Sequence, residues 1–155
     1  MIAASPIHIR PARRSDVPGI VALLADDAIG QGRERPESIE RYFAAYDALA
    51  SDPAVRCLVA ADEEDAVTGY VQVTITRHLS FGGARRALVE DLRVAPAHRR
   101  NGLGTRLVEA AIAAALSAGC DIVQLFVHRD REAAHCFYRK LGFQIDHLGL
   151  RLSLK

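Results

Sequence analysis

The sequence lacks both a pairable set of cysteines and a long hydrophobic run. Its three cysteines, Cys57, Cys120 and Cys136, are odd in number and widely spaced, which excludes a full disulfide framework and a CxxC motif. The alanine-rich run at residues 110–118 is far shorter than the roughly 20 residues needed to span a bilayer. A reduced, cytoplasmic compartment is therefore expected.

The sequence also lacks a charge excess and a leader-like start. Lys and Arg number 20 against 19 Asp and Glu, and this net charge of +1 does not indicate a nucleic-acid or membrane partner. Residues 1–10 contain no basic segment followed by an apolar core, so no secretory signal is expected. The six histidines show no HxH or HxxxH grouping, so no metal site is predicted.

The length and the periodicity of the chain predict one domain of mixed architecture. Domains usually contain about 100–200 residues, so residues 1–155 are expected to form a single domain. Apolar periodicity predicts strands at 8–10, 55–61, 67–76, 87–94, 121–127, 143–145 and 148–154. Helices are predicted after caps at Ser15 or Asp16 and at Ser38, then from the loop at 97–104 to Gly119, and at 131–141. This order predicts an α/β fold with a strand meander and a parallel element.

The most informative segment is RRNGLGT at residues 99–105. It lies between a predicted strand and a helix start, where backbone N–H groups have no intrahelical acceptor and the helix dipole adds about half a positive charge. Gly102 and Gly104 carry no side chains, so an anion can approach the backbone closely. Residues 85–106 contain six arginines and two carboxylates. We therefore expect this segment to bind a multiply charged anion.

The pattern of this loop narrows the choice of anion. The chain has no GxxxxGK[ST] motif, and GxGxxG fails at its third glycine. The pattern [Arg/Gln]-x-x-Gly-x-[Gly/Ala], filled by Arg99, Gly102 and Gly104, resembles the pyrophosphate loop of the GNAT superfamily of N-acetyltransferases. Two flanking stretches extend the resemblance. VEDLRVAP at 89–96 is similar to the strand before that loop, and AHCFYRKLGF at 134–143 is similar to the family's A-xx-FY-xx-LGF helix and strand.

The resemblance implies a GNAT-like fold, in which a central, mostly antiparallel sheet splays between its fourth and fifth strands and carries helices on both faces. It implies acetyl-CoA as cosubstrate and an acetyl group transferred directly to a primary amine, with a backbone amide near Val94 stabilising the oxyanion. It further implies the residues that contact acetyl-CoA: Leu92, Arg93, Val94, Arg99, Arg100, Asn101, Gly102, Leu103, Gly104, Thr105 and Arg131.

Arg131 departs from the family pattern. Many members have an asparagine at this position, seven residues before a tyrosine. The resemblance implies that Arg131 or Arg129 meets the 3′-phosphate of the cofactor, while Asp130 caps the helix.

Tyr138 occupies the position of a tyrosine that, in many members, protonates the departing thiolate. A phenol with a pKa of about 10 can donate a proton to a thiolate whose conjugate acid has a pKa of about 8.5. The alternative is a packing role, since Tyr138 shares a helical stripe with Ala134 and Leu141.

Glu90 is the candidate general base. Strand alternation places it on one face with Leu88, Leu92 and Val94, where desolvation raises the pKa of a carboxylate. The alternatives are a carboxylate neutralised by a nearby arginine such as Arg85, and a reaction without a protein base.

The sequence leaves the acceptor open. Residues 134–154 look similar to small-amine acetyltransferases, aminoalkylphosphonate acetyltransferases among them, so the expected partners are acetyl-CoA and a small amine. A homodimer is an option, and no nucleic-acid or membrane partner is expected. Arg33, Arg35 and Arg77 either suit an acceptor with an acidic group or face solvent. The alternative functions are acetylation of a protein N-terminus or lysine, and a non-catalytic acyl-CoA sensor; the near-neutral charge disfavours DNA binding.

Overall fold

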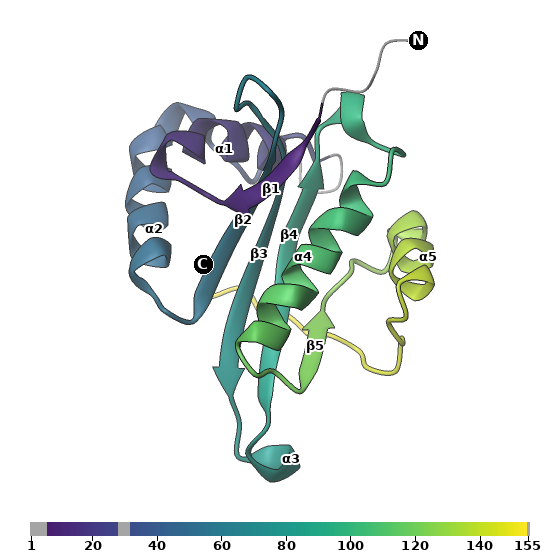
Figure 1. Cartoon of the computed structure of the whole chain (residues 1–155). Coiled ribbons are helices and arrows are strands. Elements are labelled where there is room, and N and C mark those ends of the chain that lie inside the picture. Colours follow the sequence, from purple (N-terminus) through teal and green to yellow (C-terminus); the bar gives the residue numbers. More distant parts are fainter. Residues whose placement is uncertain (1–5, 28–31, 155) are drawn as a thin grey trace. The chain divides into compact units, whose positions relative to one another are not determined.

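The computed structural model describes residues 6–27 and 32–154 (Figure 1). They fall into two compact units, Met1–Gln124 and Leu125–Lys155, and each is described by itself. The strands are β1 (His8–Pro11), β2 (Val55–Ala61), β3 (Val67–Arg77), β4 (Arg85–Val94) and β5 (Ile122–Leu125). The α-helices are α1 (Val17–Ala25), α2 (Ile39–Ser51), the short α3 (Ser80–Gly83), α4 (Leu103–Ser117) and α5 (Glu132–Lys140). Within the described ranges, no helix is long and apolar enough to cross a membrane.

The five strands form one sheet in the order β1-β2-β3-β4-β5. The first four strands pair antiparallel with their neighbours in sequence, so the predicted meander is confirmed. β5 follows α4 and runs parallel to β4, which confirms the predicted parallel element and the mixed α/β class. β5 is shorter than the strand predicted at 121–127.

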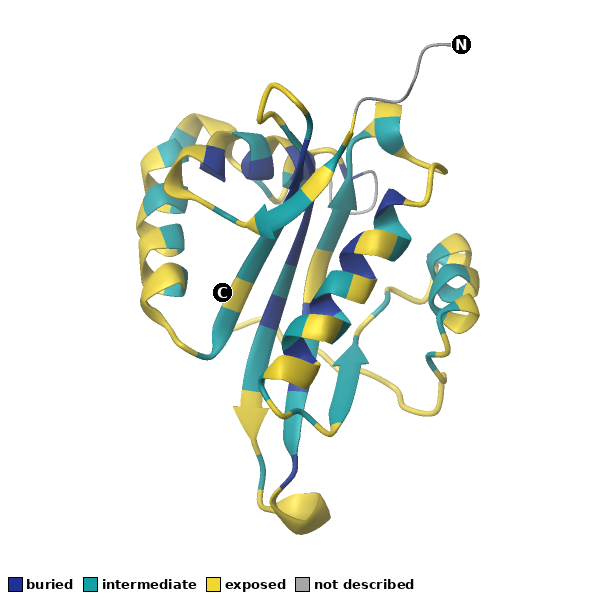
Figure 2. Ribbon diagram, viewed as in Figure 1, coloured by how far each residue is buried: buried dark blue, intermediate teal, exposed yellow. Residues whose placement is uncertain are grey.

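Helices cover both faces of this sheet (Figure 2). Buried side chains of β3 contribute to the hydrophobic core on each face. On one face α4 packs closely at Gly69, where an added Cβ would lie 2.7 Å from Leu107 Cδ1 and 3.2 Å from the Arg93 carbonyl oxygen. On the other face Tyr70 clusters with Ile20 of α1. Adjacent β3 residues therefore point into different hydrophobic layers, as the period of two requires.

Hydrogen bonds between arginines and Asp16, not a side-chain cap, hold the segment that leads into α1. The side chain of Asp16 does not cap the helix as predicted; it accepts hydrogen bonds from Arg10 Nη1 at 2.7 Å and from the Arg13 backbone N–H at 2.6 Å. Burial alone would raise the pKa of Asp16, but these donors outweigh it and lower the pKa. Ser38 is the N-cap residue of α2, at the predicted position, but its side chain makes no capping hydrogen bond.

The second unit contains α5 and an extended tail. The predicted helix at 131–141 is confirmed as α5, but the strands predicted at 143–145 and 148–154 are wrong, because no strand forms there. Four leucines of the tail alternate along the chain and are almost fully exposed, with exposed fractions of 83–97%: Leu148, Leu150, Leu152 and Leu154.

Candidate functional site

The loop predicted to bind an anion leads into α4 through a sharp turn. Arg100 and Gly102 both have left-handed backbone conformations, with φ of 62° and 78°. Arg106 is the first helical residue whose N–H has a backbone acceptor, the Gly102 carbonyl at 3.1 Å. In the described part of the chain, the three N–H groups of Leu103, Gly104 and Thr105 have no such acceptor, and no side chain caps them. These open donors, together with the helix dipole, suit a diphosphate.

The edge of β4 that precedes this loop is hydrogen-bonded by side chains. Arg93 Nη1 donates to the Leu92 carbonyl at 2.9 Å, and Arg99 Nε donates to the Val94 carbonyl at 2.9 Å. The buried Nε of Arg93 has no acceptor among the described residues. An amide chain such as pantetheine offers donors and acceptors to such an edge, so the predicted residues at 92–94 fit that ligand.

A β-bulge at Asp91 changes which β4 side chains share a face. Tyr70 pairs with Arg93 and Gln72 with Glu90, so a single β3 residue opposes two residues of β4. Asp91 has a φ of 54°, which is uncommon for a non-glycine residue. Glu90 and Arg93 therefore lie on the same face, the face of Tyr70, although strict alternation predicted opposite faces.

The prediction that Val94 shares the face of Glu90 is wrong for the same reason. Val94 pairs with Gly69, whose face is covered by α4. The bulge thus separates Val94 from the residues above it on the strand and brings the Arg93 side chain toward α1.

Glu90 lies in a polar row across the sheet. Its cross-strand neighbour is Gln72, which accepts a hydrogen bond from the Tyr70 hydroxyl at 3.3 Å. Glu90 is an exposed residue, yet partial desolvation and the adjacent Asp91 carboxylate raise the pKa of its side chain. No ion pair to Glu90 forms in the described ranges, so the structure does not support the alternative of a carboxylate neutralised by Arg85.

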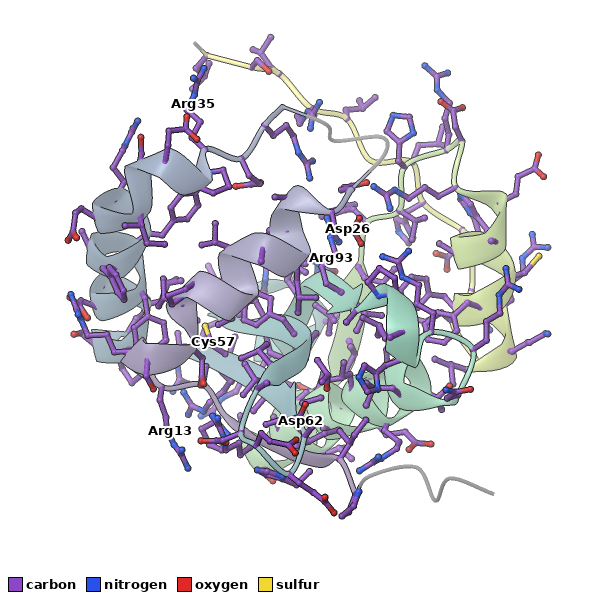
Figure 3. All side chains as sticks on the ribbon, turned by 90° about the horizontal axis from the view of Figure 1, so that it is seen from above. Arg13, Asp26, Arg35, Cys57, Asp62 and Arg93 are labelled. Carbon is purple, nitrogen blue, oxygen red and sulfur yellow. The ribbon has the colours of Figure 1, made fainter. Side chains whose placement is uncertain are left out.

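Two aspartates just after α1 contact the site, and sequence analysis missed both. Asp26 accepts from Arg99 Nη2 at 2.6 Å, and the buried Asp27 accepts from Arg93 Nη2 at 3.0 Å and from Arg33 Nη2 at 3.1 Å. Figure 3 looks down on this cluster and labels Asp26 and Arg93. The sequence signal was an acidic pair at the end of an apolar helix, but no local pattern identifies its distant arginine partners.

Tyr138 and Arg131 belong to the second unit. The Tyr138 ring is half-buried and packs edge-to-face against Phe137 and Phe143, with centroids 5.0 and 5.7 Å apart. Arg131 is the N-cap residue that precedes α5, so the predicted cap at Asp130 is wrong; an Asp130 carboxylate oxygen instead lies 3.5 Å from His128 Nδ1. The predicted roles, Tyr138 as the acid that protonates the departing thiolate and Arg131 as a contact of the 3′-phosphate, stay predictions.

The mixed sheet with helices around it is the fold of an acetyltransferase. The model of the Acetyltransferase (GNAT) family matches residues 19–143, and the chain belongs to this family. It is an N-acetyltransferase, as the resemblance implied.

Relatives of this chain act on different amines. Thialysine N-epsilon-acetyltransferase of Mus musculus is 27% identical over 144 residues, covering 88% of this chain and 84% of that protein. N-alpha-acetyltransferase 30 of Homo sapiens is 34% identical over 141 residues; the match covers 90% of this chain but only 35% of the human protein. Among solved structures, a protein named a transcriptional regulator from Bacillus halodurans C-125 has a TM-score of 0.92 at 35% identity, covering 96% of this chain and 100% of that one.

Proposed function

We propose that this protein transfers an acetyl group from acetyl-CoA to the primary amine of a small molecule, by direct attack of the amine on the thioester. The observation that carries the proposal is the set of open N–H groups at Leu103, Gly104 and Thr105. They follow a strand on which arginine side chains bond the carbonyls of Leu92 and Val94. The two units would work as one acetyltransferase domain, since the family model extends across both.

The proposed cofactor contacts follow from these donors. The diphosphate would lie against the backbone of residues 99–105, with the guanidinium groups of Arg99 and Arg100 adding charge, and Arg131 or Arg129 would meet the 3′-phosphate. The pantetheine arm would follow the backbone of residues 92–94. Arg99 and Arg93 would then exchange their bonds to β4 carbonyls for bonds to the cofactor or to water.

The proposed chemistry moves two protons. Acetyl-CoA supplies the thioester carbonyl that is attacked. Glu90 accepts a proton from the amine, directly or through water, and Tyr138 Oη donates a proton to the departing sulfur. The backbone N–H near Val94 donates to the developing oxyanion.

Two alternatives remain distinct from a small-amine enzyme. The human relative is named an N-alpha-acetyltransferase, which favours a protein N-terminus as the alternative acceptor within the enzyme class. The structural neighbour from Bacillus halodurans is named a transcriptional regulator, which corresponds to the alternative of an acyl-CoA sensor. A sensor would bind acetyl-CoA and release no thiol with any amine.

A thiol-release screen tests the proposed function. The purified chain is incubated with acetyl-CoA and a panel of diamines, amino acids, aminoalkyl acids and N-terminal peptides, and free coenzyme A is measured with a thiol reagent. We expect release that depends on one class of small amine. Acetyl-CoA affinity without release would favour the sensor, and release with peptides alone would favour the N-terminal enzyme.

A pH profile tests the role of Glu90. Activity should fall as the pH drops through the raised pKa of Glu90, because only the carboxylate can accept a proton. Glu90→Gln is expected to lower kcat about 100-fold. Asp91→Asn is the matched variant: asparagine tolerates the left-handed backbone and removes the neighbouring charge, so the acidic limb should move to lower pH. An unchanged acidic limb in both variants would exclude Glu90 as the base.

We also propose a homodimer in the cytoplasm. The tail at 148–154 exposes four leucines, and subunit contacts commonly cover exposed apolar side chains. The three cysteines are free, as is usual in a reducing compartment. The molar mass from light scattering tests the assembly.

A further inference from the structure

A hollow of about 300 Å³ opens where the chain enters α2. Its lining consists of three arginines, two hydroxyl-bearing residues and one alanine: Arg33, Arg35, Arg41, Ser38, Tyr42 and Ala45. None of these residues is acidic, although the whole chain carries a net charge of only +1. Arg33 is paired with Asp27, so the uncompensated positive charge of the lining comes from Arg35 and Arg41, and an anion between these two would lower their repulsion.

Hydrogen bonds fix part of this hollow in place. The Tyr42 hydroxyl accepts the Arg35 backbone N–H at 2.7 Å and donates to Glu34 at 3.0 Å, so the Glu34 carboxylate is already engaged. In the described ranges, the guanidinium groups of Arg35 and Arg41 have no ion-pair partner. The N–H donors of these two guanidinium groups and the Ser38 hydroxyl are therefore available to a ligand.

The hollow connects to the edge of β4 through a buried carboxylate. Arg33 lines the hollow and donates to Asp27, whose side chain is only 3% exposed. The same Asp27 oxygen accepts from Arg93, which also bonds the Leu92 carbonyl. A ligand in the hollow would thus be separated by one ion-pair chain from the strand edge proposed to hold the pantetheine arm. An acceptor with an anionic group at one end and an amine at the other would join these two places. Arg35, labelled in Figure 3, lies in the segment that leads into α2.

We propose that this hollow binds an oxyanion of the acceptor, and that the acceptor is a small primary amine carrying a phosphate, phosphonate or carboxylate group. The inference rests on the proposed acetyl transfer and names its substrate class. Arg35 and Arg41 supply guanidinium groups without an ion-pair partner among the described residues, and their planar donor pairs match the geometry of a phosphate, phosphonate or carboxylate. Arg33 is oriented by Asp27 and completes the positive rim.

Kinetics with matched amines test the proposal. Amines of equal chain length that end in phosphonate, carboxylate, methyl or a second amine are compared in the wild type, in Arg35→Gln and in Arg41→Gln. We expect the anionic acceptors to have the highest kcat/KM, and each variant to lower that value about tenfold through KM. The methyl-terminated amine and the KM for acetyl-CoA should be unaffected. Arg56→Gln, an exposed arginine on β2, is the control and should match the wild type.

Each result decides the proposal. Equal kcat/KM for charged and uncharged acceptors, or variants that do not discriminate between them, would overturn it while leaving acetyl transfer intact. Better turnover of a peptide with an acidic second residue would overturn the small-molecule assignment.

A second measurement is independent of turnover. The wild type is titrated with inorganic phosphate while the arginine Nε–H resonances are followed by NMR, and the two variants identify the peaks of Arg35 and Arg41. Shifts of these peaks support an oxyanion site even if no amine is acetylated, an outcome that would refute the proposed function alone. Unmoved peaks would overturn the site.

Discussion

Gly102→Asp is expected to weaken acetyl-CoA binding by at least about 100-fold. Gly102 immediately precedes the three open N–H groups of α4, and its φ of 78° places it in the left-handed region. Nothing lies within 4 Å of a Cβ built there, so the new carboxylate would fit sterically. Its negative charge would lie beside the donors proposed for the diphosphate and would repel that group. Isothermal titration calorimetry with acetyl-CoA measures the effect.

Gly102→Asn is the matched control for this prediction. Asparagine has nearly the same size as aspartate, and both tolerate a left-handed backbone better than other non-glycine residues do. The affinity of the asparagine variant therefore measures the effect of added bulk and backbone strain. The difference in affinity between the two variants measures the effect of the negative charge. We expect Asn to cost about tenfold or less in affinity, with similar melting temperatures for both variants. Equal affinity of the two variants for acetyl-CoA would contradict the proposal that the diphosphate binds at this loop.

Much of the first unit could be predicted because its signals are local. The apolar run at 55–61 and the alternation at 67–76 predicted β2 and β3 within one residue at each end. Gly102 and Gly104 marked the start of α4, since a helix beginning in an anion-binding loop favours residues without side chains. Each of these elements is defined by residues that are neighbours in the sequence.

The arrangement of the candidate site depended on features that are not local. The extra residue of the β-bulge at Asp91 reverses the alternation of side chains along β4, so Arg93 faces α1 and not α4. Nothing in VEDLRVAP marks the position of the extra residue. Asp26 pairs with an arginine 73 positions away and Asp27 with one 66 positions away, and only the folded chain shows these ion pairs.

In the tail, a local pattern predicted an element that does not form. Alternating leucines at 148–154 have the period of a strand, and the pattern predicted one. A strand also needs a neighbour that supplies backbone hydrogen bonds, and the described unit at 125–154 contains none for this segment. Periodicity therefore carries no information about whether a neighbouring strand is present to pair with the segment.

Tyr138→Phe is expected to lower kcat about 100-fold while leaving the affinity for acetyl-CoA unchanged. The substitution removes only the hydroxyl, and the ring keeps its edge-to-face contacts with Phe137 and Phe143, so the melting temperature should be similar. The loss would fall on the chemical step, because the hydroxyl donates its proton only as the carbon–sulfur bond breaks. Single-turnover and steady-state rates measure it.

The leaving group separates this role from packing. A general acid matters less when the departing thiolate is already stable, so the defect of Tyr138→Phe should shrink several-fold with an acetyl thioester of a more acidic thiol. A packing defect would be the same for both thioesters and would lower the melting temperature. Phe137→Leu removes one of the two ring contacts and keeps the hydroxyl, so it should reduce stability while retaining the wild-type dependence on the leaving group. Wild-type turnover in Tyr138→Phe would assign this tyrosine to the core of its unit and leave the departing sulfur to be protonated by water.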